Sequence, residues 1–249
     1  MTAGPARRGA PLPYTLLAGV EPVRSGWLVV TGRLMGATLV LADAVVFEKF
    51  IDVQDARPSF QVITLHAPVG LPEKDEQGGR QCDRAARKML GFPRQAAIIS
   101  PPSRATLTDA AGRTGSPTAI AEWAKAHKGV SATRLRHVVE IGEAVAAYWQ
   151  RTIYECNPEL SFMELNSGQP LKFGKHSESG IAERRALLTG RMGGADRFLD
   201  RTIKGIRRYQ LWDACADLWS ARRIAGRAIA SLPEMPEWDE LGRRMELVR

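Results

Sequence analysis

Several side chains that could bind a cation or transfer a proton stand out in this sequence. Asp213 and Asp217 lie four residues apart in the segment LWDACADLW, so in a helix they would share one face. Solvent exposure is one explanation for such a pair. Acids on an otherwise apolar segment also favour a functional site, and Asp213 is preferred over Asp217 as its member. The other candidates, Glu21, His66 and Glu155, stand at the ends of predicted strands. Taken singly, they are typical of a turn residue, a hydrogen-bonded structural histidine and a surface acid.

The cysteines and glycines exclude some kinds of site. Cys82, Cys156 and Cys215 are odd in number and widely separated, whereas structural zinc sites place cysteines roughly two to four residues apart. The spacing therefore indicates free thiols. Gly78-Gly79-Arg80 is too short to cradle a phosphate, and the chain has no Walker-type or dinucleotide-binding motif. A small-molecule phosphotransferase is therefore the weakest of the alternatives.

Positive charge is concentrated in one part of the chain. The 249 residues carry a net charge of +8, and the pI is near 9.7. Between Glu183 and Arg227, eleven Arg or Lys residues stand against five Asp or Glu residues. A clustered positive charge favours a phosphate backbone, so nucleic acid is the expected partner. A plain amphipathic surface helix is the alternative for the part from Arg201 to Arg208.

Short apolar runs predict the strands that must position these side chains. Phe60 to Leu65 is a compact, β-branched run typical of a buried parallel strand. Thr152 to Cys156 predicts another strand, and the terminal RRMELV is a last strand or a frayed tail. Three further runs lie close together and predict an antiparallel meander, namely Leu16 to Val20, Gly26 to Leu34 and Thr38 to Phe47.

Helical spacing and capping residues predict most of the remaining elements. Residues 91–116 are rich in Pro, Ser and Gly and predict a long loop, which in a compact domain is usually functional or mobile. Helices are expected over residues 47–56, 79–90, 117–127, 131–150, 159–166, 177–191, 195–208 and 209–231.

Composition also predicts the domain organisation. Residues 1–13 are rich in Gly, Pro and Arg and predict a disordered tail. With 44% apolar residues, the chain can fill one core, so residues 14–249 are expected to form a single domain with a helical insertion around residues 92–150. No segment approaches the roughly 18 apolar residues of a membrane span, and no secretory signal is apparent. We therefore expect a soluble, cytoplasmic protein without a membrane partner; the oligomeric state is not predictable.

Four motifs, in this order and spacing, carry a resemblance to a known family. The first is Gly19-Val20-Glu21, which leads through a turn to Gly26-Trp27. The second is the loop HAPVGLP at residues 66–72, and the third is YECNPELSF at residues 154–162. The fourth is Asp213-Ala214 in the predicted late helix. With these motifs the chain resembles the family catalogued as domain of unknown function 429 (DUF429), whose members are predicted nucleases.

The resemblance implies both a fold and a site. The expected fold is α/β, a ribonuclease H-like mixed sheet flanked by helices. Carboxylates from the first strand, a central strand end and a late helix would converge on one or two divalent cations, and by position these are Glu21, Glu155 and Asp213. Two cations about 4 Å apart can activate water and stabilise the leaving oxygen of a phosphodiester. Oxygen ligands suit Mg²⁺ or Mn²⁺.

The chain departs from the family at several acidic positions. Glu21 replaces an Asp, His66 stands where a carboxylate is expected, and Tyr209 and Gln210 replace a frequent acidic pair. Fewer negative ligands weaken the binding of a hard cation. His66 could instead be a ligand for manganese or zinc, or a general base. Two functions follow: a metal-dependent nuclease of DNA or RNA with Glu21, His66, Glu155 and Asp213 as catalytic residues, or an impaired relative that binds nucleic acid or a partner protein without cleavage.

Overall fold

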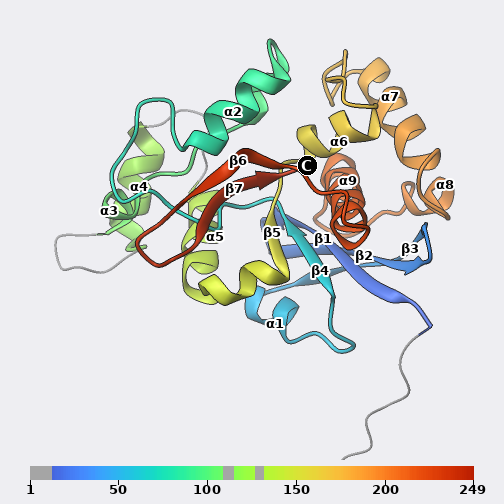
Figure 1. The fold of residues 1–249 in the computed structure, drawn as a ribbon, viewed down its shortest axis with the longest axis horizontal. Coiled ribbons are helices and arrows are strands. Elements are labelled where there is room, and N and C mark those ends of the chain that lie inside the picture. Colours follow the sequence, from blue (N-terminus) through green and yellow to red (C-terminus); the bar gives the residue numbers. More distant parts are fainter. Residues whose placement is uncertain (1–12, 109–114, 127–131) are drawn as a thin grey trace, which may run out of the picture.

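The computed structural model describes residues 13–108, 115–126 and 132–249 (Figure 1). Its central feature is a five-stranded sheet in the order β3-β2-β1-β4-β5. Strand β2 is antiparallel to β1 and β3, whereas β4 is parallel to both β1 and β5. This mixed α/β arrangement confirms the expected fold class and is consistent with a ribonuclease H-like fold. The strands are β1 (Thr15–Val23), β2 (Gly26–Met35), β3 (Thr38–Phe47), β4 (Val62–Leu65) and β5 (Ile153–Glu155).

Helices cover both faces of the sheet because side chains alternate between the two faces along each strand. Leu17, Leu28 and Val30 point to one face, where they pack against α9 (Arg208–Ala225) and its neighbours α6 (Pro158–Leu165) and α7 (Glu178–Thr189). Ala18, Val20 and Val29 point to the other face, where they pack against α1 (Phe50–Gln54) and α5 (Ala132–Ala144). Figure 1 shows α9 lying against the sheet with α7 and α8 beyond it. We call the face of the sheet that packs against α9 the α9 face.

The remaining elements surround this core. Strands β6 and β7 form a separate antiparallel pair, and α2 contacts both of them. The described part of the segment between α2 and β5, where a helical insertion was expected, contains two α-helices and two 3-10 helices in addition to α5. The bounds of these elements are α2 (Gln81–Leu90), η1 (Arg94–Ala97), α3 (Arg104–Leu107), α4 (Pro117–Ala126), η2 (Ala147–Arg151), α8 (Ala195–Phe198), β6 (Ser231–Trp238) and β7 (Arg244–Val248).

The predicted meander, the parallel strand β4 and the strand β5 are confirmed, as are the free thiols of all three cysteines. Residues 1–12 of the predicted tail lie outside the described residues. Among the described residues, no helix combines the length and the apolar character needed to cross a membrane.

Three predicted helices were too long. Residues 131–150 divide into α5 and η2, because Gln54 and Arg243 donate hydrogen bonds to the carbonyls of Ala144 and Gly142 at the end of α5. The helix predicted over 195–208 ends at Phe198, so the basic residues from Arg201 to Arg207 do not share a helical face. The helix predicted to reach residue 231 ends at Ala225.

The strand after α9 was not predicted, because it contains two prolines. Pro233 and Pro236 lie in β6, where the pairing with β7 shifts register between Leu232 and Glu237. Proline cannot donate to a strand ladder and is tolerated at such irregular positions. The C-terminal RRMELV segment is confirmed as a strand, since β7 pairs with β6.

Candidate metal centre

Glu21 and His66 lie side by side because the pairing of β1 with β4 places them there. The parallel register aligns Gly19 with Thr64 and Val20 with Leu65, and the His66 amide continues the ladder by donating to the Val20 carbonyl at 2.9 Å. Side chains two residues apart on a strand share a face. Glu21 and His66 therefore both lie on the α9 face, and His66 Nδ1 is 2.7 Å from Glu21 Oε2.

Helix α9 brings an aspartate to the same place. A Cβ atom on Gly19 would lie 2.1 Å from the Ala214 carbonyl oxygen and 2.4 Å from the Leu218 amide nitrogen, so only glycine allows the helix to approach β1 so closely. The Thr64 hydroxyl donates to the main-chain carbonyl of Asp217 at 2.7 Å and ties the helix to β4. This packing turns the Asp217 carboxyl toward Glu21 and His66.

Glu21, His66 and Asp217 form a group that could hold a metal ion, and we call it the acidic trio. Each offers one ligand atom, and these atoms all lie within 4.8 Å of one another. Their positions are buried or half-buried between β1, β4 and α9. The trio therefore brings together two carboxylates and an imidazole from three elements that are distant in the sequence.

Asp217 is the least satisfied member of the acidic trio. Its side chain is fully buried, and Ser161 donates to Oδ1 at 3.0 Å. Oδ2 has no hydrogen-bond partner among the described residues; the nearby Cys156 thiol is a weak donor. Burial, together with the Glu21 and Asp213 carboxylates, raises the pKa of Asp217 well above its usual range. A buried carboxylate oxygen without a partner is costly, and a bound cation would relieve that cost.

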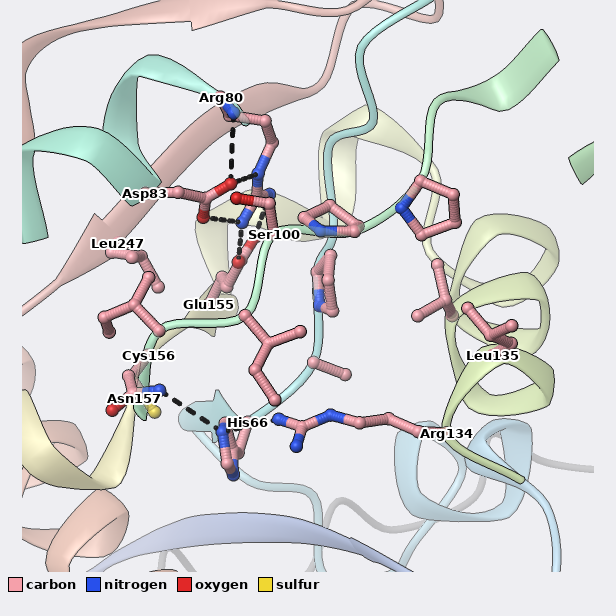
Figure 2. Close-up of a pocket in the computed structure, with 17 residues that line it drawn as sticks. His66, Arg80, Asp83, Ser100, Arg134, Leu135, Glu155, Cys156, Asn157 and Leu247 are labelled. Carbon is pink, nitrogen blue, oxygen red and sulfur yellow. Dashed lines mark hydrogen bonds and ion pairs between the residues drawn. The ribbon is translucent and has the colours of Figure 1, made fainter. Parts of the chain in front are cut away.

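The imidazole of His66 has its hydrogen-bonding roles set by its neighbours. Asn157 Oδ1 accepts from the Glu159 amide at 3.0 Å, which turns its Nδ2 toward His66 Nε2 at 3.3 Å. Arg134 Nη2 also lies 3.0 Å from His66 Nε2, and Figure 2 shows Arg134 pointing at the ring. Both groups can only donate, so Nε2 accepts and the Nδ1 proton is directed at Glu21. With both ring nitrogens engaged in this way, a cation would bind His66 by displacing either the Nδ1 proton or the donors at Nε2.

Asp213 lies one helical turn from Asp217 but is engaged by a lysine. Lys175 Nζ is 2.8 Å from Asp213 Oδ2. Burial raises the pKa of Asp213 to about 6, and the ammonium of Lys175 limits the rise, while the Glu21 carboxylate adds to it. Asp213 is therefore close enough to interact electrostatically with the acidic trio, but the Lys175 ammonium group already balances its charge.

Glu155 points to the opposite face of the sheet from the acidic trio. Its strand partner is Leu65, which belongs to the core on the α5 side. The next residue along the chain is Cys156, whose amide donates to the Leu65 carbonyl. Its side chain turns to the α9 face. Arg80 donates to both Glu155 oxygens, at 2.5 and 2.9 Å (Figure 2). The Val69 amide also donates to Glu155 Oε2, so the carboxylate is held in a buried ion pair.

Comparison with known proteins gives a family. The model of the family described as "Protein of unknown function (DUF429)" matches residues 19–238. The chain belongs to the DUF429 family. The match includes the acidic trio and also Glu155 and Asp213. No curated protein and no solved structure matches the chain, so this family membership is the whole result of the comparison.

Two positions of this DUF429 protein where acids were expected have other contacts. Tyr209 lies under Lys175, whose Nζ is 4.6 Å from the ring centroid. Gln210 accepts a hydrogen bond from the Arg207 amide at 3.0 Å and so caps the start of α9. Neither belongs to the acidic trio. Of the predicted site residues, the structure thus brings together Glu21 and His66, with Asp213 next to them and Glu155 on the other face.

Asp217 was weighed in the sequence but not preferred over Asp213. Its place in the site depends on the close packing of Gly19, which no pattern in the sequence signals. Because Gly19 packs against Ala214 and Leu218, the part of α9 next to β1 is the turn that contains Asp217. Without the structure, the sequence gives no sign of where Gly19 makes contact.

A cleft of about 360 Å³ opens beside the trio of this DUF429 protein. His66, Asn157 and Arg134 line it, together with Lys175 and His176. A second cleft of about 320 Å³ shares Lys175 and His176 and continues past Asp213 to Tyr209. Of the acidic trio, His66 is the member that lines the larger cleft, and the trio therefore borders a cleft with cationic side chains.

Proposed function

We propose that this protein is a divalent-metal-dependent phosphodiesterase that cleaves nucleic acid, with Glu21, His66 and Asp217 as its metal ligands. The observation that carries the proposal is the buried, unpartnered Oδ2 of Asp217, a residue that offers one of three ligand atoms within 4.8 Å of one another. Among the described residues, Lys175 supplies positive charge nearby but is bonded to Asp213, and Arg134 lies against the His66 ring. A divalent cation supplies the missing charge.

The donor set favours a particular kind of cation. Two carboxylates and one neutral imidazole balance the charge of a divalent ion. Carboxylate oxygens suit Mg²⁺ and Mn²⁺, and an imidazole nitrogen shifts the preference toward a transition metal. Mn²⁺ is therefore the best match, with Mg²⁺ as the weaker alternative. When bound, such an ion polarises a phosphoryl oxygen and lowers the pKa of water.

The protein's own residues perform the other tasks of the reaction. Lys175 holds an ammonium group at the edge of both clefts, where it can bind a non-bridging phosphate oxygen. Arg134 and Asn157 hold the His66 ring in one orientation through Nε2. In known sites the second nitrogen of a metal-bound histidine donates a hydrogen bond, so these two donors would have to turn away from Nε2 when the ring binds metal through Nδ1. Arg134 also faces the cleft, so it can contact the substrate backbone.

Metal binding is the first test, because it does not depend on knowing the substrate. Mn²⁺ at a hundred times its Kd stabilises a folded protein by about 2.7 kcal/mol, which for a chain of this size raises Tm by roughly 5–10 °C. We expect Asp217→Asn to lose most of that rise, because it removes a ligand. Glu48→Gln, at an exposed acid outside the trio, should keep it. Equal Tm shifts in Asp217→Asn and the unaltered protein would rule out this metal centre.

Cleavage is the second test. The unaltered protein with Mn²⁺ should convert end-labelled DNA or RNA to a ladder of shorter products, and Asp217→Asn should not. Metal binding by the trio without any cleavage would instead favour the catalytically impaired relative that binds nucleic acid. The neutralised Asp213 is the feature that favours that second reading, since a two-cation site would need a further free carboxylate.

A further inference from the structure

The larger cleft beside the acidic trio has a cationic lining. Arg94, Arg134 and Lys175 contribute to its walls, and His176 lies at the Lys175 end. The one acidic residue among its lining residues, Glu159, is paired with Arg184. Lys175 is paired with Asp213, so Arg94 and Arg134 give the cleft its excess of positive charge. Such a field attracts a chain of phosphates.

Two exposed phenylalanines directly precede residues that line this cleft. Phe92 has 89% of its surface exposed and precedes Pro93 and Arg94, which line the cleft. Phe173 is 46% exposed and precedes Gly174 and Lys175, which also line it. Arg94 Nη1 donates to the Phe173 carbonyl at 3.3 Å, so the two segments meet at the cleft.

The two exposed rings belong to segments that meet at one cleft, which indicates what they could bind there. Burying a Phe side chain stabilises a fold by about 1.5–3 kcal/mol, so leaving two of them in solvent forgoes a sizeable contribution. Aromatic rings beside a basic groove are the arrangement that binds single-stranded nucleic acid: the groove follows the backbone, and unpaired bases stack on the rings. In a duplex the bases already stack on one another, so these rings would find no partner.

From this geometry we infer that the cleft binds single-stranded nucleic acid, with its phosphates along Arg94, Arg134 and Lys175 and its bases on Phe92 and Phe173. This inference rests on the proposed function and names its substrate class. It places the strand next to the acidic trio through His66, which lines the same cleft. A single-stranded region, and not a paired one, would then be the form that is cut.

Binding can be measured apart from cleavage by working in EDTA with the full chain. The probes are a fluorescein-labelled oligothymidylate of about 12 nucleotides and the same strand paired with oligodeoxyadenylate. Fluorescence anisotropy should show tighter binding of the single strand. Phe92→Ala and Phe173→Ala should each weaken single-strand binding by about tenfold, because base stacking on one ring is lost. Tyr148→Ala, which removes a 60% exposed ring whose neighbours in sequence do not line the cleft, should leave it unchanged.

The contribution of the cationic residues that line the cleft is measured by the salt dependence of binding. Arg94→Gln should weaken binding of every sequence alike and lower the slope of log Kd against log salt by about one. Arg24→Gln, at an exposed arginine that does not line the cleft, should lower neither. All these substitutions except Arg94→Gln alter exposed side chains, so far-ultraviolet circular dichroism should confirm an intact fold.

The outcomes separate this inference from the proposed function. Equal affinity for single strand and duplex, or Phe variants that bind as the unaltered protein does, would overturn the inference even if the protein cleaves nucleic acid with Mn²⁺. Selective single-strand binding that depends on both rings would support it even if no metal binds to the trio, in which case only the proposed hydrolysis fails.

Discussion

The packing of α9 on β1 can be tested by adding one methyl group, with Gly19→Ala. The new Cβ would lie 2.1 Å from the Ala214 carbonyl oxygen, whereas ordinary contact begins at 3.4 Å, so the helix and strand must separate by about 1.3 Å. Both obstructing groups, Ala214 and Leu218, contribute main-chain atoms that cannot rotate away. Overpacking typically costs 1–3 kcal/mol, and we expect about 3 kcal/mol here.

The same displacement should damage the metal centre. Metal ligands tolerate deviations of about 0.2 Å, so moving Asp217 away from Glu21 by more than that should weaken Mn²⁺ binding by about 10- to 100-fold. Urea unfolding followed by circular dichroism measures the first effect, and Mn²⁺ titration followed by electron paramagnetic resonance, at a temperature where the variant is folded, measures the second.

A matched control is available in α5. A Cβ on Gly142 would meet nothing closer than Arg243 Nη1 at 3.9 Å, so Gly142→Ala should leave metal binding unchanged and stabilise the helix by roughly 0.5–1 kcal/mol. If Gly19→Ala unfolds at the same urea concentration as the unaltered protein and binds Mn²⁺ equally well, then close helix packing does not position the acidic trio.

Two further predictions concern buried charges away from the trio. Glu155→Gln should lower the free energy of unfolding by about 3 kcal/mol, because Arg80 stays buried with only Asp83 as a charged partner; urea unfolding measures this, and a variant that keeps its stability but loses Mn²⁺ affinity would instead make Glu155 a metal ligand. Burial lowers the pKa of His137 below its ordinary value of 6.5, although the Gly26 carbonyl opposes the shift. The unfolded chain then binds the proton more readily, so this contribution to stability is complete above pH 6.5 and is lost as the pH falls toward the folded-state pKa. Unfolding free energies measured across that range should fall less steeply in His137→Gln, and parallel curves would contradict the assignment.

Local patterns in the sequence were sufficient for the sheet and for the family. Alternating and β-branched runs predict β1 to β5 because strand formation depends on neighbouring residues, and motif order predicts the DUF429 family that the match over residues 19–238 shows. Helix ends were less predictable. Leu199 does not continue α8, since its carbonyl accepts from the Trp212 indole at 3.0 Å, and that contact joins residues that no local pattern connects.

The candidate site needed both strand register and helix packing, and these are tertiary properties. The sequence shows an acid or a histidine at Glu21, His66 and Glu155, near strand ends, and an acid at Asp213 within a helix. It does not show to which face of the sheet each side chain points. A shift of one residue along β5 turns a side chain to the other face of the sheet, so Glu155 meets Arg80 while Cys156 faces α9. The contact at Gly19 likewise decides that Asp217 joins the trio and that Asp213 pairs with Lys175. The sequence by itself determined which side chains were available, and only the fold decided which of them share a pocket, because that depends on distances between elements far apart in the chain.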